Sequence, residues 1–286
     1  MRRISTVDVG TNTVLACVVE PDRVVWDAAR ITRLGGGVDA SRALRDDAMD
    51  RTLDALRELV AQARANGAEC VVGVGTSALR DASNRDRFVV RAREVVDDFQ
   101  VIDGAREAEL TYRGALFGLP RARGPVTVVD IGGGSTEIVR GEGETVLSRV
   151  SVDVGSVRLT ERHDDLAAIR ADIAAAMRDV EIAAPLVMVA GTATNVAAVA
   201  LGRDLARGAA SPHGERVKAT ALRAAIIRIV RATPHERRAM VGIERGRQDV
   251  IGAGACIFEH VLDRSGAKDV TISDGGVRFG LALSLF

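Results

Sequence analysis

The sequence has few residues that would cross-link the chain or hold it in a membrane. Its three cysteines, Cys17, Cys70 and Cys256, lie far apart, form no CxxC pair and are too few for a disulfide framework. No apolar run approaches the roughly 18 residues that a membrane span needs. The N-terminus leads into a strand-like pattern rather than a signal-peptide core. We therefore expect a cytoplasmic protein with no membrane partner.

Histidine and lysine are also scarce, and the chain has no net charge. The four histidines form no HExxH or HxH cluster, which argues against a zinc site. Lys+Arg and Asp+Glu both total 39, so the formal net charge is zero and we expect no nucleic-acid partner. Lys218 and Lys268 are the only lysines, and the other basic residues are arginines, whose five-donor fork suits anions. A biased genome composition would give the same count.

The remaining sequence is typical of a globular α/β protein. It has 286 residues, of which 47% are hydrophobic and 27% charged, enough for one large domain or two medium ones. Short β-rich runs bounded by glycine alternate with helical patterns, which predicts α/β architecture. The stretch GLPRARGP at 118–125 is rich in turn residues. We place a boundary there and predict domains over 1–118 and 119–286.

Periodicity predicts the individual elements. Strands are expected over 4–9, 13–19, 70–74, 101–102, 126–131, 136–140, 186–190 and 269–273. Helices are expected over 46–66, 84–99, 105–116, 164–183, 218–232, 234–241 and 249–262, with a turn at 191–195 and a terminal helix that follows the turn at 274–276. The terminal helix is a candidate to pack back on the first domain.

Two segments of the chain have the same pattern. DVGTNTV begins at Asp8 and DIGGGSTEIV begins at Asp130. In each, an aspartate ends an apolar strand, a glycine follows two residues later, and hydroxyl or amide side chains precede a second strand. The similarity predicts a duplicated fold whose halves face each other across a cleft.

The second of these segments is the stronger candidate for binding phosphate. Consecutive glycines leave a turn without Cβ atoms, so that backbone N–H groups can converge on an anion while hydroxyls add donors. The turn contains Gly132, Gly133, Gly134, Ser135 and Thr136. Asp130 can anchor a divalent cation, and Glu137 is a candidate second carboxylate. The alternative is a plain glycine hairpin with a capping serine.

The first segment offers similar chemistry with more side-chain donors. Its turn contains Thr11, Asn12 and Thr13. Taken alone it is a weak signal, because polar hairpin turns are common. As the symmetric partner of the Asp130 segment it gains weight, since two facing hairpins would contact one phosphoryl group from opposite walls.

Six ordered motifs together resemble the exopolyphosphatase and guanosine pentaphosphate phosphohydrolase (Ppx/GppA) family, within the actin, Hsp70 and sugar-kinase superfamily. They are DVGTNTV, TSALRDA from Thr76, DIGGGSTEIV, VGSVRLTE from Val154, GTATN from Gly191 and SDGGVRFG from Ser273. The resemblance covers nearly the whole chain. It implies a two-domain, ribonuclease-H-like α/β fold with an interdomain active-site cleft.

The resemblance also implies roles for particular residues. Glu107, in REAEL, takes the position of the catalytic glutamate that activates water. The same resemblance makes Arg80 a phosphate ligand beside the turn residues Thr11, Asn12, Thr13, Gly132, Gly133, Gly134 and Ser135. Asp8, Asp130 and Glu137 are the candidates to hold Mg²⁺ or Mn²⁺. From sequence alone, Glu107 and Glu109 would each be solvated helix carboxylates. Arg80 would equally suit a surface ion pair with Asp81.

Three further segments have weaker interpretations. Arg158 is a lesser phosphate-binding candidate, and the segment 191–195 resembles the superfamily's nucleoside-side loop, although it need only line the cleft. The turn at 274–276 would serve equally as a plain connection. The arginines Arg85, Arg87, Arg91 and Arg93 alternate with Asp86 and Glu94, which favours a solvated mixed face over a polyanion track.

The activity implied by the resemblance is Mg²⁺-dependent release of terminal orthophosphate from inorganic polyphosphate or from guanosine pentaphosphate. Arg106, Glu109 and Phe279 depart from the family pattern, and the chain ends at Phe286 without the long members' helical region, so we expect shorter polyphosphates to be favoured. Alternatives are an ATP-dependent small-molecule kinase and a non-catalytic sensor of polyphosphate or an alarmone. Relatives are often dimeric, which makes a homodimer possible.

Overall fold

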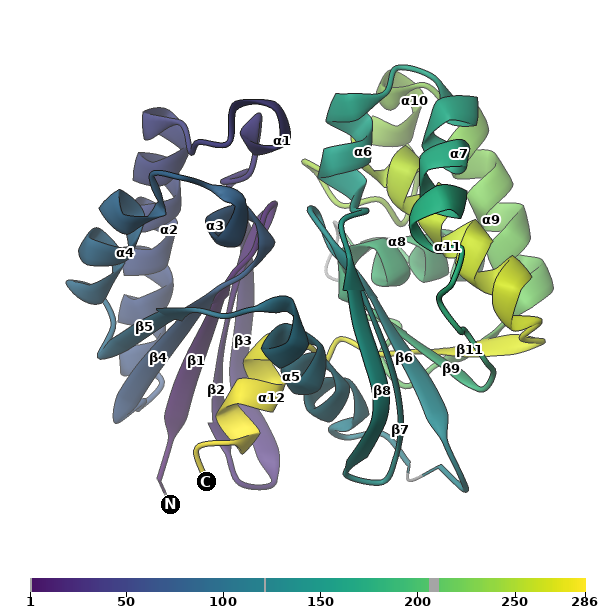
Figure 1. Cartoon of the computed structure of the whole chain (residues 1–286). Coiled ribbons are helices and arrows are strands. Elements are labelled where there is room, and N and C mark those ends of the chain that lie inside the picture. Colours follow the sequence, from purple (N-terminus) through teal and green to yellow (C-terminus); the bar gives the residue numbers. More distant parts are fainter. Residues whose placement is uncertain (1, 121, 206–210) are drawn as a thin grey trace.

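The chain folds around two mixed β-sheets that lie in separate halves of the molecule (Figure 1). The computed structural model describes residues 2–120, 122–205 and 211–286. The first sheet has the strand order β3-β2-β1-β4-β5, and the second has the order β10-β11-β9-β6-β7-β8. None of the helices described in these ranges is long and apolar enough to cross a membrane.

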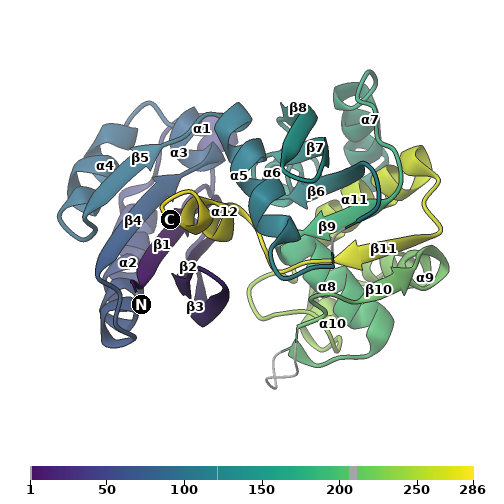
Figure 2. The ribbon, with the colours of Figure 1, turned by 90° about the horizontal axis from the view of Figure 1, so that it is seen from below.

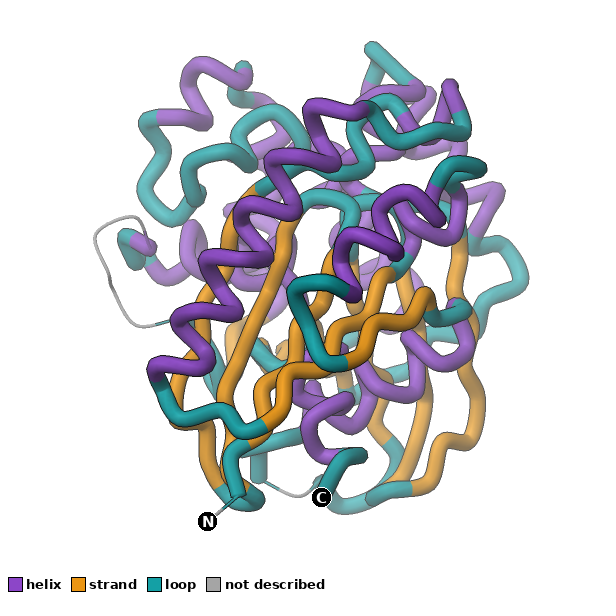
Figure 3. Tube along the Cα trace, turned by 90° about the vertical axis from the view of Figure 1, so that its left-hand side faces the viewer, coloured by secondary structure: helices purple, strands orange, loops and turns teal. Residues whose placement is uncertain are grey.

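The first half contains the N-terminal elements of the chain. Its strands are β1 (Ile4–Val9), β2 (Thr13–Glu20), β3 (Arg23–Ile31), β4 (Cys70–Gly75) and β5 (Asp98–Val101). The helices in this part of the sequence are α1 (Val38–Ser41), α2 (Asp46–Ala65), α3 (Ser77–Asp81), α4 (Arg85–Arg93) and α5 (Gly104–Leu116). Figure 3, with this half toward the viewer, shows helices lying over the strands.

The second half repeats this plan. Its strands are β6 (Val126–Ile131), β7 (Thr136–Glu142), β8 (Thr145–Val152), β9 (Leu186–Val189), β10 (Arg216–Lys218) and β11 (Asp269–Ile272). Its helices are α6 (Ser156–Arg162), α7 (Leu166–Ala176), α8 (Ala190–Leu201), α9 (Ala219–Arg231), α10 (Pro234–Arg238) and α11 (Ile251–Ser265), and α12 (Val277–Leu283) ends the chain.

The duplication predicted from the two aspartate motifs is confirmed by the topology. In each half a central strand, β1 or β6, pairs antiparallel with the next strand and parallel with a later one, β4 or β9. The strand order 3-2-1-4-5 that results is that of a ribonuclease-H-like fold, and it occurs twice. Asp8 and Asp130 therefore occupy equivalent places on the two central strands. In the β6–β7 ladder Asp130 lies opposite Glu137, whereas Asp8 lies opposite Leu15.

Several predicted elements differ in extent from the structure. The strand expected over 101–102 is β5 (Asp98–Val101), and the helix expected over 234–241 ends at Arg238. The helix expected over 84–99 ends at Arg93, because Phe99 turns inward on β5 and packs edge-on against Phe88 with ring centroids 6.0 Å apart. The helix expected over 164–183 ends at Ala176, where Arg264 binds the carbonyls of residues 177, 178 and 180. The turn expected at 191–195 is the start of α8, which follows β9 directly.

Seven elements were not predicted from the sequence. Six of them are short or partly exposed, namely β3, β8, β10, α1, α3 and α6, and the seventh is the whole of α8, where only a turn was expected. Strands β3 and β8 lie beside β2 and β7 and are partly exposed over most of their length. Their exposed positions mix polar residues with Val24 and Leu147, so the two strands lack the long apolar run by which the buried strands were recognised.

Helices α5 and α12 lie between the two halves (Figure 2). Helix α5 packs on the second sheet, where Ala108 and Tyr112 join a core with Val128 and Val139. Helix α12 packs on the first sheet, where Phe279 and Ala282 join Cys17 and Val19. The backbones of the two helices approach closely, because a Cβ at Gly280 would lie 1.9 Å from the Leu110 carbonyl oxygen. Helices α5 and α12 therefore connect the two halves, since each packs on one sheet and both pack on each other.

Replacing Gly114 with alanine is expected to destabilise the protein by about 3 kcal/mol or more, as overpacking at a rigid contact does. A Cβ at Gly114 would lie 2.0 Å from the Gly276 carbonyl oxygen, and backbone atoms cannot move aside as a flexible side chain can. Gly276 itself is the control, because its φ is −176° and a Cβ there would meet nothing within 4 Å. Urea unfolding of the two variants checks this; equal midpoints would contradict it.

Candidate active site

The two hairpin turns predicted to bind phosphate meet between the halves. Each is closed by the same backbone bond, from Gly10 N to Thr13 O and from Gly132 N to Ser135 O, both at 3.0 Å. A Cβ at Gly134 would lie 2.9 Å from Thr11 Oγ1, and one at Gly133 would lie 2.9 Å from Thr11 Cβ. The glycines are therefore needed for the turns to come together.

A cleft of about 750 Å³, including its open mouth, lies between these turns. Most of the predicted site residues line it: Asp8, Thr11, Asn12, Thr13, Glu107, Asp130, Gly132, Gly133, Gly134 and Ser135. Two predicted residues lie outside this lining. Arg80 contacts Glu107 from α3, and Glu137 accepts a hydrogen bond from Ser151 Oγ at 2.7 Å.

The glycine-rich turn has its carbonyl groups bound on the side of α6. Gly132 O accepts from Ser156 N at 3.0 Å, and Gly133 O accepts from Val157 N at 2.8 Å. Gly134 O accepts from Arg158 Nε at 2.6 Å. Because a trans peptide places its N–H opposite its C=O, the N–H groups of residues 133–135 point away from α6. These groups form a concave set of donors of the kind that binds anions.

The first turn is held in a related way. Thr11 O accepts from Gly35 N at 2.8 Å, and Asn12 O accepts from Thr32 N at 2.9 Å. The peptide N–H groups of residues 12 and 13 consequently point away from those partners. The Asn12 side chain is only 5% exposed, yet neither of its amide atoms has a hydrogen-bond partner. A buried amide without hydrogen-bond partners lowers the stability of the fold, which is consistent with an amide whose partner is a bound ligand.

Replacing Asn12 with leucine is expected to raise the KM for a phosphate substrate at least tenfold while leaving the melting temperature unchanged or higher. Leucine loses the ligand-facing amide but also removes two buried polar atoms that lack partners. Thr32→Val is the matched control, since the Thr32 hydroxyl is also buried without a partner but lies outside the cleft lining. The control should keep the wild-type KM; a large rise in it, or a destabilised Asn12→Leu variant, would contradict the assignment.

Four acidic side chains gather around the floor of the cleft. Burial raises the pKa of Asp130 to about 7, with a contribution from the charge of Glu107, while the Thr111 hydroxyl opposes the shift. Burial likewise raises the pKa of Asp8 and of Glu137 well above their ordinary values, and the charges of Glu107 and Asp130 add to both shifts. Mutual repulsion in a poorly solvated place makes this cluster receptive to a cation.

The acidic cluster fits a magnesium ion that keeps part of its water shell. Within the described ranges, no three His, Cys, Asp or Glu side chains converge closely enough to hold a metal alone. Mg²⁺ usually takes one or two carboxylates and fills its shell with waters and substrate phosphates. Asp8 Oδ1 is buried and has no hydrogen-bond partner, so it is free to face such an ion.

Glu107 stands in the first turn of α5, where Asp103 caps the helix by accepting from Arg106 N at 2.7 Å. It is 7% exposed, so the alternative of a solvated helix carboxylate is wrong for this residue. Burial raises the pKa of Glu107, and the ion pair with Arg80 opposes that shift. Glu109 does fit the alternative, since it is partly exposed and pairs with Arg106 and Arg113.

The ion pairs of Arg80 and Arg158 differ from those considered in the sequence, whereas those of the α4 arginines agree with it. Arg80 pairs with Glu107 rather than with Asp81. Arg158 is buried behind the glycine-rich turn and pairs with Asp39 and Asp81, so its donors already have partners. The mixed-face interpretation of α4 is confirmed by the pairs of Arg87 with Asp46 and Arg91 with Asp50.

Two cleft arginines were missed by sequence reasoning. Arg278 is held by both carboxylate oxygens of Asp27 at 2.8 Å, and its positive charge lowers the pKa of Asp8 and Asp130, opposing burial. Arg247 donates to Glu244 at 2.7 Å and covers Gly191. Arg278 lies within the quoted motif SDGGVRFG, which was the available signal; Arg247 stands in a loop with no pattern of its own.

The segment 191–195 contributes little to the cleft. Gly191 lines it, whereas Asn195 is fully buried and bonds to Glu244. This arrangement leaves the segment as part of the cleft wall and of the α8 core rather than as an exposed loop.

Paired ribonuclease-H-like halves with opposed hairpin turns define a duplicated α/β fold with a cleft between its halves. A sequence model of the Ppx/GppA phosphatase family matches residues 19–286. The chain is 37% identical to exopolyphosphatase 2 of Mycobacterium tuberculosis over 317 aligned residues, covering 100% of this chain and 99% of that one. It also matches the guanosine-5'-triphosphate,3'-diphosphate pyrophosphatase of Vibrio atlanticus, with 36% identity over 56% of this chain and 33% of the relative.

Solved structures agree with the sequence relatives. A crystal structure of an exopolyphosphatase from Cytophaga hutchinsonii superposes with a TM-score of 0.88 at 25% identity, covering 99% of this chain and 97% of that one. The Aquifex aeolicus Ppx/GppA enzyme gives a TM-score of 0.80 at 26% identity, covering 99% of both chains. This chain belongs to the Ppx/GppA phosphatase family and is a phosphoanhydride hydrolase.

Proposed function

We propose that the enzyme releases the terminal phosphate of inorganic polyphosphate with the help of Mg²⁺ or Mn²⁺, and that it favours short chains. The observation that carries this proposal is the meeting of the two turns, with inward peptide N–H groups, in a cleft that the carboxylates of Asp8, Glu107 and Asp130 also line. Such a site combines donors for phosphate oxygens with acceptors for a cation.

Residues of both halves would share the binding of the terminal phosphoryl group. The peptide N–H groups of 133–135 and the amide of Asn12 donate to its oxygens from opposite walls. Asp8, Asp130 and Glu137 would hold the cation, directly or through water. When bound, that ion would neutralise charge on the phosphate oxygens.

Glu107 would accept a proton from the attacking water. The water oxygen bonds to the terminal phosphorus as the bridging P–O bond breaks, so that orthophosphate and a polyphosphate shorter by one unit leave. The ion pair with Arg80 restrains the Glu107 carboxylate and favours its ionised form, which a base requires.

The preference for short chains is supported by the charges around the cleft. Two of the α4 arginines that could extend a polyanion track, Arg87 and Arg91, are paired with Asp46 and Asp50 of α2. These two side chains are therefore less available to a long polyphosphate. Guanosine pentaphosphate presents the same terminal group, and the match to the Vibrio relative makes it the second candidate substrate.

Orthophosphate release from tripolyphosphate, long-chain polyphosphate and guanosine pentaphosphate tests the proposal, each with Mg²⁺, Mn²⁺ or EDTA. We expect turnover only with a divalent ion, and the highest kcat/KM on tripolyphosphate. Faster release from guanosine pentaphosphate would reassign the substrate. No release from any of the three with either ion would refute the proposed function.

A further inference from the structure

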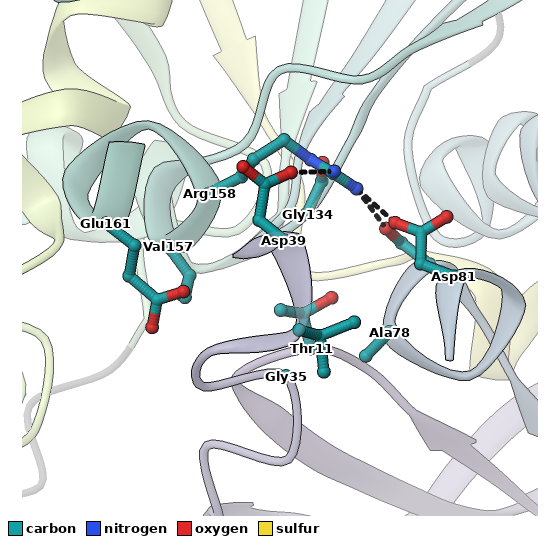
Figure 4. Close-up of a pocket in the computed structure, with 11 residues that line it drawn as sticks. Thr11, Gly35, Asp39, Ala78, Asp81, Gly134, Val157, Arg158 and Glu161 are labelled. Carbon is teal, nitrogen blue, oxygen red and sulfur yellow. Dashed lines mark hydrogen bonds and ion pairs between the residues drawn. The ribbon is translucent and has the colours of Figure 1, made fainter. Parts of the chain in front are cut away.

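Arg158 lies where the two halves touch, on the side of the cleft opposite α5 and α12 (Figures 1 and 4). Its side chain is 6% exposed although it is fully charged. Nη1 lies 2.5 Å from Asp39 Oδ1, Nη2 pairs with Asp81, and Nε donates to Gly134 O at 2.6 Å. A single guanidinium thereby joins α1, the end of α3 and the glycine-rich turn.

The partners of Arg158 come from both halves of the molecule. Asp39 and Asp81 belong to the first half, whereas Arg158 and Gly134 belong to the second. Neighbouring contacts reinforce the junction, since the Glu161 carboxylate accepts from Gly37 N at 3.0 Å and Arg162 also reaches Asp39 at 2.9 Å. Among the ion-paired side chains at this junction, that of Arg158 is the most buried. Arg158 also contacts the glycine-rich turn.

The contact with Gly134 O bears on the phosphate donors. The same peptide plane carries Gly134 O and the N–H of Ser135, so fixing the carbonyl fixes the direction of that N–H. Because the guanidinium is planar and rigid, its two carboxylate partners set the orientation with which Nε meets the carbonyl. The position of the first half thus determines the direction of the Ser135 N–H group in the second half.

We propose that Arg158 is a positioning residue that couples closure of the two halves to the alignment of the glycine-rich turn. It does not touch the substrate. When Arg158 is paired with Asp39 and Asp81, the two turns are held at the separation needed to bind one phosphoryl group. Without these ion pairs, the glycine-rich turn moves away from Thr11, and its N–H groups no longer point at the phosphoryl oxygens. The effect on turnover rests on the proposed function, whereas the closure itself does not.

Steady-state kinetics on tripolyphosphate is the first test, with Arg158→Met, Arg158→Lys and the control Arg162→Met. Arg162 lies on the same helix and also pairs with Asp39, but no contact joins it to Gly134 or Asp81 among the described residues. We expect Arg158→Met to lower kcat about 10- to 100-fold with less than a threefold change in KM, because misalignment affects the chemical step. Lysine should restore kcat in part, and Arg162→Met should stay within twofold of wild type.

Distances between the halves give a readout that does not depend on activity. Val90 on α4 is 61% exposed and Ile227 on α9 is 46% exposed, so cysteines at both can carry spin labels once Cys70, the partly exposed native thiol, is replaced by serine. We expect a narrow distance distribution in the otherwise wild-type background and a longer, broader one with Arg158→Met. Tripolyphosphate with Mg²⁺ should shift the variant back toward the narrow distribution.

Loss of Arg158 leaves Asp81 without its ion-pair partner and Asp39 with Arg162 alone, and an unpaired carboxylate in a poorly solvated place by itself can unfold a protein. The triple variant Arg158→Met, Asp39→Asn, Asp81→Asn removes that charge; it should melt close to wild type but keep the low kcat and the broad distances. Unchanged kcat and distances in either variant would overturn the proposal. A wild-type enzyme that releases no phosphate would refute the proposed function, and the distance measurements would still decide the closure.

Discussion

Replacing Glu107 with glutamine is expected to lower kcat for phosphate release from tripolyphosphate by about 10²- to 10⁴-fold, the range that a positioned general base contributes. Glutamine has nearly the same shape but cannot accept the proton of the attacking water. Glu107 borders the cleft from α5 and is restrained by its ion pair with Arg80, an ion pair that no other carboxylate lining the cleft makes among the described residues. KM should change little, since binding is assigned to the two turns.

Glu109→Gln is the matched control for that variant. Glu109 lies on the same helix, but it is partly exposed and pairs with Arg106 and Arg113 outside the cleft lining. Its substitution should leave kcat within about twofold of wild type. Melting curves of both variants separate loss of chemistry from loss of fold, because Arg80 loses its charged partner in Glu107→Gln. Full phosphate release by a folded Glu107→Gln enzyme would show that this carboxylate is not the base.

The parts of the site that the sequence predicted are those encoded within a few residues. An aspartate at the end of an apolar strand, followed by glycines and then a second strand, determines a hairpin and the register that sets Asp130 beside Glu137. The same pattern at Asp8 predicted the first turn. Duplication then implied that the turns face each other, and the contact of Thr11 with Gly133 and Gly134 confirms it.

The parts that were missed depend on residues far apart in the chain. Arg278 meets Asp27 across 251 positions, and Arg158 meets Asp39 across 119 and Asp81 across 77. No local pattern distinguishes such an arginine from the many solvated ones. The packing of α5 on the second sheet and of α12 on the first is equally non-local, because the sequence of a helix does not show which sheet it covers.

Arg80 shows how the distant and local parts combine. Its motif was recognised, and a phosphate role and a pair with Asp81 were the two interpretations. In the folded chain Asp81 is bound by Arg158, which leaves Arg80 to Glu107. Removing Arg158 would therefore leave Asp81 available to Arg80, and Arg80 is the residue that restrains Glu107.

Replacing Asp130 with asparagine is expected to abolish phosphate release and yet stabilise the metal-free protein at pH 8. Burial raises the pKa of Asp130 from 3.8 to about 7, so the folded chain binds this proton more tightly than the unfolded chain does. Stability from this group is therefore greatest at low pH, falls as the pH rises from about 4 to about 7, and is lost above that. At 1.36 kcal/mol per pKa unit, the ionised form costs on the order of 4 kcal/mol at pH 8.

Asparagine keeps the shape and removes the charge, so at pH 8 in EDTA we expect the melting temperature of Asp130→Asn to exceed that of wild type by roughly 5–10 °C. The difference should narrow at pH 5, where wild-type Asp130 is protonated in the folded chain. Mg²⁺ should raise the melting temperature of wild type more than that of the variant, because a cation relieves the repulsion that the substitution has already removed.

Asp98→Asn, exposed on β5, should show none of these effects. A variant that melts below wild type at pH 8 in EDTA would mean that Asp130 stabilises the fold, and the acidic cluster would then be a structural network rather than a site for a cation.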